Sequence, residues 1–379
     1  MGVETKYRLK AKLALEDGTL FDGYGFGFPS RTVGEVVFNT GMVGYTESLT
    51  DPSYRGQLLC FTYPLIGNYG VPDLAARDKY NLPVGFESES LQVSGVVVQE
   101  VCEEPSHWAS KMSLNEWLKQ GKVSGIYGID TRELTKKLRV HGVMMSVLEI
   151  SKDPASDEDL LKALKASRSY EEINFVEEVS TKQPIEYGGG DDAVVLIDCG
   201  VKISIVRELL RRGLKVIRVP YNASSKEVLK YNPKGVVISN GPGDPKLCVD
   251  TARTTKELFE EGVPILGICL GTQIIALALG GDTFKLKYGH RGQNKSCVDM
   301  GRSYVTSQNH GYTVDTESLK GTGLKPWFVN ADDKTCEGLK HKNGRCISVQ
   351  FHPEASPGPY DTTFVFDEFY KILGGGSSE

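Results

Sequence analysis

The chain has 379 residues, which is long for a single hydrophobic core, so we expect two or three domains. An apolar fraction of 40% and a charged fraction of 25% are typical of a soluble globular protein. The net charge of -5 argues against a nucleic-acid-binding protein, and no run of about 18 apolar residues is present that could span a membrane.

Residues 1–151 are predicted to form a β-rich domain of the α+β class. Their short apolar runs are separated by Gly, Asp and Pro, as in "KLALEDG", "EVVFNT" and "LLCFTYP". Two helices are expected among these strands. One covers 113–121, where Ser113 and Glu116 match a capping box, and the other covers 130–142, opened by Asp130 and closed by a glycine. Residues 1–18 lack the continuous apolar segment of a signal peptide, so we expect a cytoplasmic protein.

The segment 152–191 differs in composition from its surroundings. "SDEDLLKALKAS" is typical of a charged amphipathic helix, and "STKQPIEYGGGDD" has the Pro, Gly and Asp content of a linker. We therefore predict a helix and linker here, between an N-terminal domain and a C-terminal domain that begins at residue 192.

Residues 192–379 alternate between predicted strands and helices. This alternation predicts an α/β fold, with a mainly parallel sheet flanked by helices on both faces. Ligands bind such sheets beyond the carboxyl ends of the strands. The strings "GPGDP" at 241–245 and "GICLG" at 267–271 each follow a predicted strand, so both are expected at the edge where ligands bind.

Cys269 lies between two glycines, in a pattern that matches a nucleophile elbow with a thiol in place of the usual hydroxyl. The glycines would allow a sharp strand-to-helix turn, and the following helix would favour a thiolate and offer the amide of Leu270 to an oxyanion. A cysteine that simply fits a tight turn would show the same pattern. The other seven cysteines form no C-x-x-C pair and are expected to be reduced core residues, without zinc or redox function.

His352 is the histidine best placed to act as the base. It ends a predicted strand, and Glu354 stands two residues further on, which in an extended chain is the same side of the backbone. Pro353 restricts the backbone between them. With Cys269, these residues complete a catalytic triad. Three of the remaining histidines, His107, His141 and His341, are expected to be structural or exposed. His290 is expected to be structural or in contact with a substrate or partner. His310 follows a predicted strand and is expected to line the site.

Three strings at this spacing, "SNGPGDP", "GICLGTQ" and "FHPE", together resemble the class I (triad) glutamine amidotransferases. The N-terminal half narrows the resemblance to the small, glutamine-hydrolysing chain of carbamoyl phosphate synthetase, because related families for anthranilate, GMP or CTP synthesis lack that half. The strings that carry this resemblance are "GEVVFNTGMVGYTESLTDPSYRGQ", "TYPLIGNYG", "DTRELTKKLR", "HRGQN", "TSQNHGY" and "HPEASPGPYD".

The resemblance implies that Cys269 forms a γ-glutamyl thioester, that His352 is the general base and acid, and that Glu354 orients it. Thr272 departs from the family pattern, which usually has a histidine there, so the details of that helical turn are in doubt. The residues implied to hold glutamine are Ser53, Gly241, Gly243, Leu270, Gln273, Asn309, Gly311 and Tyr312.

The chemistry that uses ammonia is expected on another polypeptide. The sequence contains no G-x-x-x-x-G-K-[ST] loop, so we expect no cofactor in this chain and place ATP and a divalent metal on the synthetase partner only. The resemblance implies a large ATP-using chain that makes carbamoyl phosphate for arginine and pyrimidine synthesis. Two alternatives are a free-standing cysteine hydrolase and a catalytically silent docking subunit.

Overall fold

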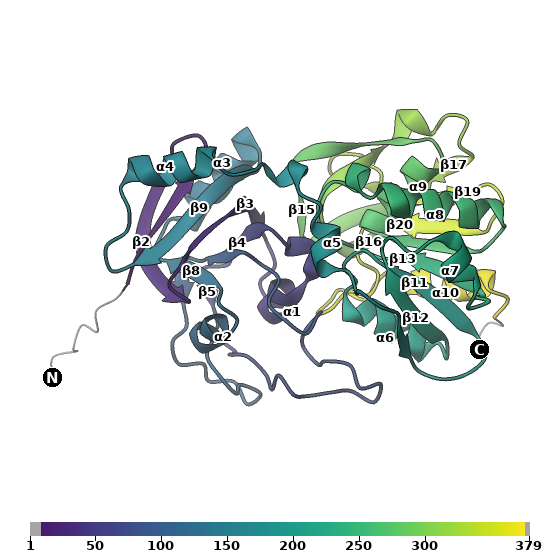
Figure 1. Cartoon of the computed structure of the whole chain (residues 1–379), viewed down its shortest axis with the longest axis horizontal. Helices are drawn as coiled ribbons and strands as arrows, with labels where there is room; N and C mark the ends of the chain where they lie inside the picture. Colours follow the sequence, from purple (N-terminus) through teal and green to yellow (C-terminus); the bar gives the residue numbers. More distant parts are fainter. Residues whose placement is uncertain (1–8, 376–379) are drawn as a thin grey trace. The chain divides into compact units, whose positions relative to one another are not determined.

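The computed structural model describes residues 9–375 (Figure 1). Residues 1–8 lie outside the described range. They are part of the segment 1–18, for which the sequence predicts no signal peptide. The described chain divides into two compact units. The first runs from residue 9 to 76 and from 83 to 173, and the second comprises residues 77–82 and those from 174 onward. The predicted domain limits at 151 and 192 stay a prediction.

The first unit is built around a closed β-barrel of mixed strand direction (Figure 1). Strands β3, β4, β6 and β8 pair in parallel, whereas β1, β2 and β9 join their neighbours antiparallel. Closure protects the backbone groups that an open sheet leaves at its edges. In barrel order the strands are β1 Lys10–Leu15, β2 Leu20–Gly27, β8 Ser124–Tyr127, β6 Gly95–Val97, β4 Gln57–Phe61, β3 Arg31–Asn39 and β9 Met144–Ser151.

The two helices predicted in residues 1–151 begin where the sequence places them, whereas the short helix α1 was not predicted. In α2, Leu114–Gln120, the Ser113 hydroxyl accepts from the Glu116 amide at 3.2 Å while the Glu116 carboxylate accepts from the Ser113 amide at 2.9 Å, which confirms the capping box. Asp130 caps the next helix by accepting from the Glu133 amide at 2.8 Å. The remaining elements of this unit are α1 Tyr45–Thr50, the 3-10 turns Pro52–Tyr54 and Tyr170–Glu172, β5 Leu65–Ile66, β7 Glu100–Val101, α3 Thr131–His141 and α4 Asp157–Lys165.

The second unit contains the mainly parallel sheet that the sequence predicts, so the α/β fold class is confirmed. Five neighbouring strands run parallel, and antiparallel strands extend both edges. In spatial order the sheet consists of β10 Ile185–Tyr187, β12 Lys215–Pro220, β11 Ala193–Asp198, β13 Gly235–Ile238, β14 Ile265–Ile268, β20 Cys346–Val349, β19 Gly338–His341 and β17 Leu324–Pro326.

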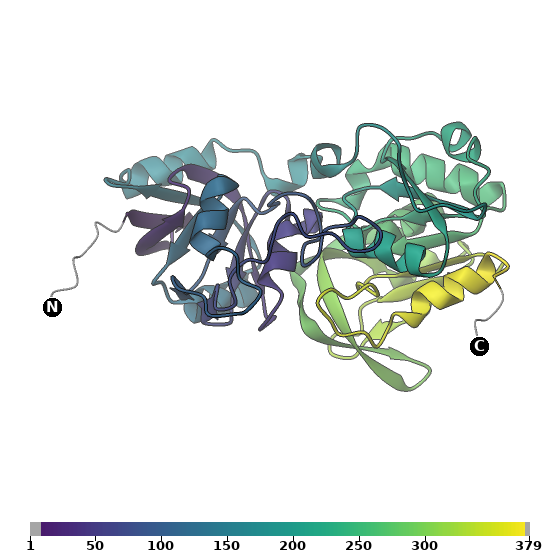
Figure 2. The ribbon, with the colours of Figure 1, turned by 90° about the horizontal axis from the view of Figure 1, so that it is seen from below.

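Helices cover both faces of this sheet (Figure 2). The apolar side chains of α6 and α10 pack against alternate residues of the central strands, such as Leu196 and Leu266. Those of α7, α8 and α9 pack against the opposite set, such as Ile197 and Ile265. Nearly continuous apolar strands are expected when both faces are buried. The helices are α5 Phe175–Val179, α6 Ile203–Arg211, α7 Ser225–Leu229, α8 Val249–Glu260, α9 Leu270–Ala278 and α10 Phe364–Ile372, with 3-10 turns at Pro245–Leu247 and Thr316–Leu319.

Two segments of the second unit differ from the sequence-based expectation. Part of the predicted linker forms β10, which pairs antiparallel with β12 at the sheet edge. His310 does not follow a strand but lies inside β16, Arg302–Asp315, which pairs with β15, Asp282–Asp299, in a separate sheet with β18, Val329–Asn330. No helix in the described part of the chain combines the length and the apolarity needed to cross a bilayer.

Candidate active site

Cys269 occupies a sharp turn at the carboxyl end of β14. It links the last residue of that strand to the first residue of α9, and its backbone has φ 54° and ψ -104°. This conformation is rarely adopted by a residue with a Cβ atom and costs on the order of 1–3 kcal/mol. β14 is paired with β13 on one side and β20 on the other, so a fully hydrogen-bonded strand fixes the turn.

The two glycines of the elbow are required by close packing. A Cβ atom on Gly267 would lie 2.5 Å from the Ile275 side chain, and one on Gly271 would lie 2.2 Å from the Ile238 carbonyl oxygen. Any larger residue would therefore push α9 away from the sheet. The pattern of Gly, Cys and Gly that the sequence shows is thus explained by the approach of helix to strand.

His352 and Glu354 are held together as the sequence predicts. Glu354 Oε1 lies 2.6 Å from His352 Nδ1, and both side chains are buried. Because the carboxylate accepts at Nδ1, Nε2 is the ring nitrogen left to face a substrate or the thiol. His352 itself lies three residues beyond β20 rather than at its end, and its amide donates to Ser307 of β16 at 2.9 Å.

Lys202 is a functional candidate that sequence analysis missed. Its ammonium lies 3.1 Å from Glu354 Oε1 and donates to the Ala355 carbonyl at 2.9 Å. The side chain is almost fully buried. The only signal in the sequence is a lysine directly after a buried strand, in "DCGVK", where a solvent-exposed charge is not expected.

The charges of this cluster shift the pKa values in opposite directions. Burial and the Lys202 charge would lower the pKa of His352, but the Glu354 carboxylate and then Cys269 raise it by more, so that the pKa lies above its usual value. Burial would raise the pKa of Glu354, but Lys202 and then His352 lower it to about 2. The carboxylate is therefore ionised and the ring is readily protonated.

The nucleophile is surrounded by groups from three further segments. Cys269 Sγ lies 3.5 Å from the Asn309 carbonyl oxygen and 3.7 Å from Gln350 Nε2. Gln273 Nε2 donates to Gln350 Oε1 at 3.1 Å and to the Tyr312 carbonyl at 2.8 Å. The structure thus brings Asn309 to the thiol and links Gln273 and Tyr312 to it through Gln350, a further neighbour that sequence analysis did not identify.

The G-P-G loop also comes close to the elbow. A Cβ atom on Gly241 would lie 2.1 Å from the Cys199 carbonyl and 2.8 Å from Leu270, and Gly243 has φ +88°. Both glycines are therefore required by close approach or by a left-handed backbone. Gly311 lies in β16 between Asn309 and Tyr312.

Two other sequence-based candidates have different outcomes. Thr272, where the family usually has a histidine, is fully buried and donates to the Val349 carbonyl at 2.7 Å, so it ties α9 to β20. Ser53 belongs to the other compact unit, in the 3-10 turn Pro52–Tyr54, where its amide donates to Asp51. Its role in binding glutamine stays a prediction.

Of the seven cysteines that were expected to be core residues, six are buried, and for these the expectation is confirmed. It is wrong for Cys102, which lies just after β7 and is only partly buried. Cys269 is buried as well. His107 and His141 are exposed and His341 is partly buried, whereas His290 and His310 are buried within the second unit.

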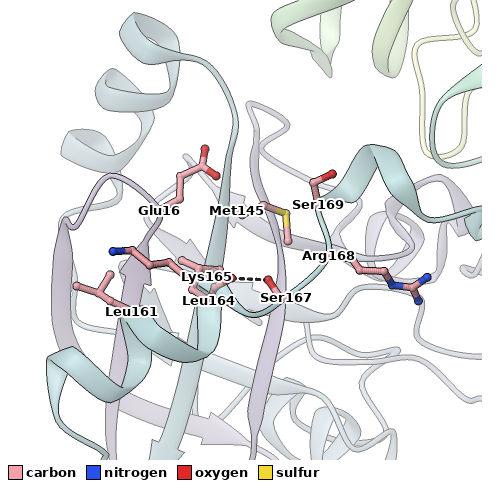
Figure 3. A pocket seen from close by; sticks show the side chains of 8 residues that line it. All are labelled: Glu16, Met145, Leu161, Leu164, Lys165, Ser167, Arg168 and Ser169. Atoms are coloured by element: carbon pink, nitrogen blue, oxygen red, sulfur yellow. Dashed lines mark hydrogen bonds between the residues drawn. The ribbon is translucent and has the colours of Figure 1, made fainter.

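A surface pocket in the first unit contains none of the predicted site residues (Figure 3). Its wall comes mainly from α4 and the turn that follows, where the Ser167 hydroxyl donates to the Leu164 carbonyl. The chemistry-bearing side chains of the elbow are not part of it. Its lining residues are Glu16, Met145, Leu161, Leu164, Lys165, Ser167, Arg168 and Ser169.

Comparison with known families identifies both parts of the sequence. Residues 13–148 match the carbamoyl-phosphate synthase small chain, CPSase domain, and residues 195–372 match the class I glutamine amidotransferases. The carbamoyl phosphate synthase small chain of Pyrococcus furiosus is 48% identical, over 97% of this chain and 98% of its own length. The chain belongs to the carbamoyl phosphate synthase small chain family.

Further relatives of this small chain family agree over nearly the whole length. The small chain of Methanopyrus kandleri is 48% identical, over 96% of this chain and 99% of its own. A glutamine amidotransferase from Thermotoga maritima of known structure aligns with 48% of this chain and 84% of its own, at 18% identity and a TM-score of 0.36. The resemblance found in the sequence is confirmed, and with it the function of a glutamine amidotransferase subunit of carbamoyl phosphate synthase.

Proposed function

We propose that Cys269, His352 and Glu354 form the triad with which this small chain hydrolyses glutamine. The thiolate attacks the side-chain amide carbon, and the resulting oxyanion is stabilised by the amide of Leu270 at the start of α9. His352 donates its proton to the departing ammonia, which leaves a γ-glutamyl thioester. His352 then removes a proton from water, water attacks the thioester, and glutamate and the thiol are released.

The observation that carries this proposal is the arrangement of His352, Glu354 and Lys202 beside the strained elbow. Glu354 accepts from His352 at 2.6 Å and is held by Lys202 at 3.1 Å, so the imidazole is fixed in one orientation. Nothing in the thioester chemistry requires a metal or cofactor in this chain.

Glutamine would be bound by main-chain and side-chain groups around the elbow. Gly241 and Gly243 support this because neither has a side chain that would keep a ligand away from the backbone of the loop, and Gln273 because it lies beside Gln350 and Tyr312. The complete proposed set is Ser53, Gly241, Gly243, Leu270, Gln273, Asn309, Gly311 and Tyr312.

A small chain implies a large-chain partner. We propose that the partner uses ATP and a divalent metal to convert the released ammonia into carbamoyl phosphate. We further propose that the complex works in the cytoplasm, without binding nucleic acid or a membrane.

Replacing Cys269 by serine tests this division of labour. The reconstituted complex of the Cys269→Ser chain should lose glutamine-dependent synthesis of carbamoyl phosphate and retain synthesis from added ammonium, because the thiol serves only to release ammonia. Loss of both activities in a complex that still assembles would contradict the proposal.

A further inference from the structure

Two histidines and a glutamate meet in the second unit, outside the triad. His290 of β15 and His310 of β16 are cross-strand partners, and their rings lie perpendicular with centroids 4.9 Å apart. Glu337, just before β19, reaches the same point. All three residues are buried, with exposed fractions of 6%, 5% and 0%, and one ligand atom from each lies within 4.8 Å of the others.

The hydrogen bonds of this cluster orient each side chain as a metal ligand requires. His290 Nε2 lies 2.8 Å from the Asp333 carboxylate, which leaves Nδ1 directed at Glu337. His310 Nδ1 lies 2.9 Å from the Tyr312 carbonyl, which leaves Nε2 directed at the same carboxylate. Ligating histidines typically use their second nitrogen in this way, to bind a carboxylate or a backbone carbonyl.

The carboxylate is supported in the same manner. Glu337 Oε1 accepts from Asn330 Nδ2 at 2.8 Å. In the described part of the chain, Glu337 Oε2 and His310 Nε2 are buried and have no nitrogen or oxygen hydrogen-bond partner, and the Cys297 thiol is a further group that interacts with Glu337. A salt bridge from His290 would account for Asp333 and for one oxygen of Glu337, but it leaves His310 Nε2 buried without a partner, which is costly.

Two of the three distances between the ligand atoms are close to those around a small divalent ion. Two atoms bound to one tetrahedral Zn²⁺ at about 2.0–2.2 Å lie roughly 3.3–3.6 Å apart. His290 Nδ1 lies 3.3 Å from Glu337 Oε1, within this range, whereas His310 Nε2 lies 3.9 Å from it and would move slightly closer when an ion binds. Two imidazoles and one carboxylate favour zinc and its transition-metal neighbours over calcium or magnesium, which prefer oxygen ligands only.

We propose that His290 Nδ1, His310 Nε2 and the Glu337 carboxylate bind one transition-metal ion of the zinc class, with water in the remaining position. Asp333, whose side chain is 43% exposed, connects the site to solvent. The proposed metal site takes no part in glutamine hydrolysis. It lies close to the nucleophile, because His310 follows Asn309, whose carbonyl contacts the Cys269 thiol. The ion would therefore fix β16 beside the nucleophile.

Cobalt is a suitable probe, since Co²⁺ adopts zinc geometries and its visible absorption reports the ligands. After treatment with a chelator, the purified chain should bind one equivalent of Co²⁺, displaceable by Zn²⁺, with visible bands and no thiolate-to-cobalt band in the near ultraviolet. A thiolate band that disappears in Cys269→Ser would place the ion at the triad cysteine and overturn the proposal, as would the absence of any stoichiometric binding.

Two variants and a matched control identify the ligands. Asp333→Asn should weaken Co²⁺ binding by roughly 10- to 100-fold, as expected for an outer-shell partner, and Glu337→Gln should weaken it more than that. Glu317→Gln makes the same change in an exposed glutamate and should bind like the unaltered chain. Unchanged binding by Asp333→Asn, with native circular dichroism, would overturn the proposal even if Glu337→Gln failed to fold.

Discussion

The ion pair between Lys202 and Glu354 allows a quantitative prediction from a single substitution. In Lys202→Met the side chain keeps most of its length but loses the charge that lies 3.1 Å from Glu354 Oε1 and the donor to the Ala355 carbonyl. Removing one member of a buried pair leaves the other charge buried without compensation, which typically costs about 3–5 kcal/mol. Glu354 keeps its bond to His352, so we expect the lower end, about 3 kcal/mol.

The pH dependence of this loss has a definite sign. The pKa of Glu354 is lowered in the folded chain, from a usual value of 4.5 to about 2. Its contribution to stability is therefore present above about pH 4.5 and is lost as the pH falls toward 2. Without Lys202 the pKa of Glu354 in the folded chain rises, so the variant should lose stability at a higher pH than the unaltered chain does.

The loss of stability in Lys202→Met can be measured locally by amide hydrogen exchange of peptides from β11 and β14. A local measurement is needed because the chain has two compact units and need not unfold in one step. Lys215→Met is the matched control. It breaks a 2.6 Å ion pair with Glu186 in which both side chains are partly exposed, and such pairs contribute about 0–1 kcal/mol. Equal protection in the two variants at pH 7 would refute the reasoning.

Three further outcomes are expected. Glu354→Gln should keep measurable glutamine hydrolysis, whereas Cys269→Ser should keep none, because the carboxylate orients the imidazole and does not bond to substrate. Steady-state assays in which both variants are equally inactive would contradict this. Thr272→Val should destabilise β14 and α9 by about 0.5–1.5 kcal/mol through the lost bond to the Val349 carbonyl, and unchanged hydrogen exchange there would contradict it. Brief alkylation at pH 7 should label Cys269 and not Cys346, because burial raises the pKa of the Cys346 thiol to about 12; peptide mapping that shows equal labelling would contradict this.

The features that could be predicted from the sequence depend on neighbours a few residues apart. The Ser113–Glu116 capping box and the glycines around Cys269 are local patterns, and their geometry follows from the backbone nearby. His352 and Glu354 were paired for the same reason, since two positions along an extended chain share one side. Alternating strands and helices likewise predicted the parallel sheet.

The features that could not be predicted depend on segments far apart in the chain. Lys202 is 153 positions from Ala355, whose carbonyl it binds, and no local pattern links them. The closure of the N-terminal barrel depends on pairing β1 with β9, although each strand alone is short and ordinary. β10 has the composition of a linker, and only the exposed edge of β12 gives it a partner.

The order of segments along the chain has a consequence for the newly synthesised protein. The elbow is translated before the other two members of the triad, since the triad is complete only 85 residues after Cys269, at Glu354. At about 5–20 residues per second, roughly 4–17 s separate the translation of Cys269 and Glu354. β20, which positions His352, inserts between β14 and β19 only after both have been made. A ribosome-bound or prematurely terminated product that ends before His352 therefore carries the thiol without the base, so the ability to release ammonia arises only after this later segment has been made.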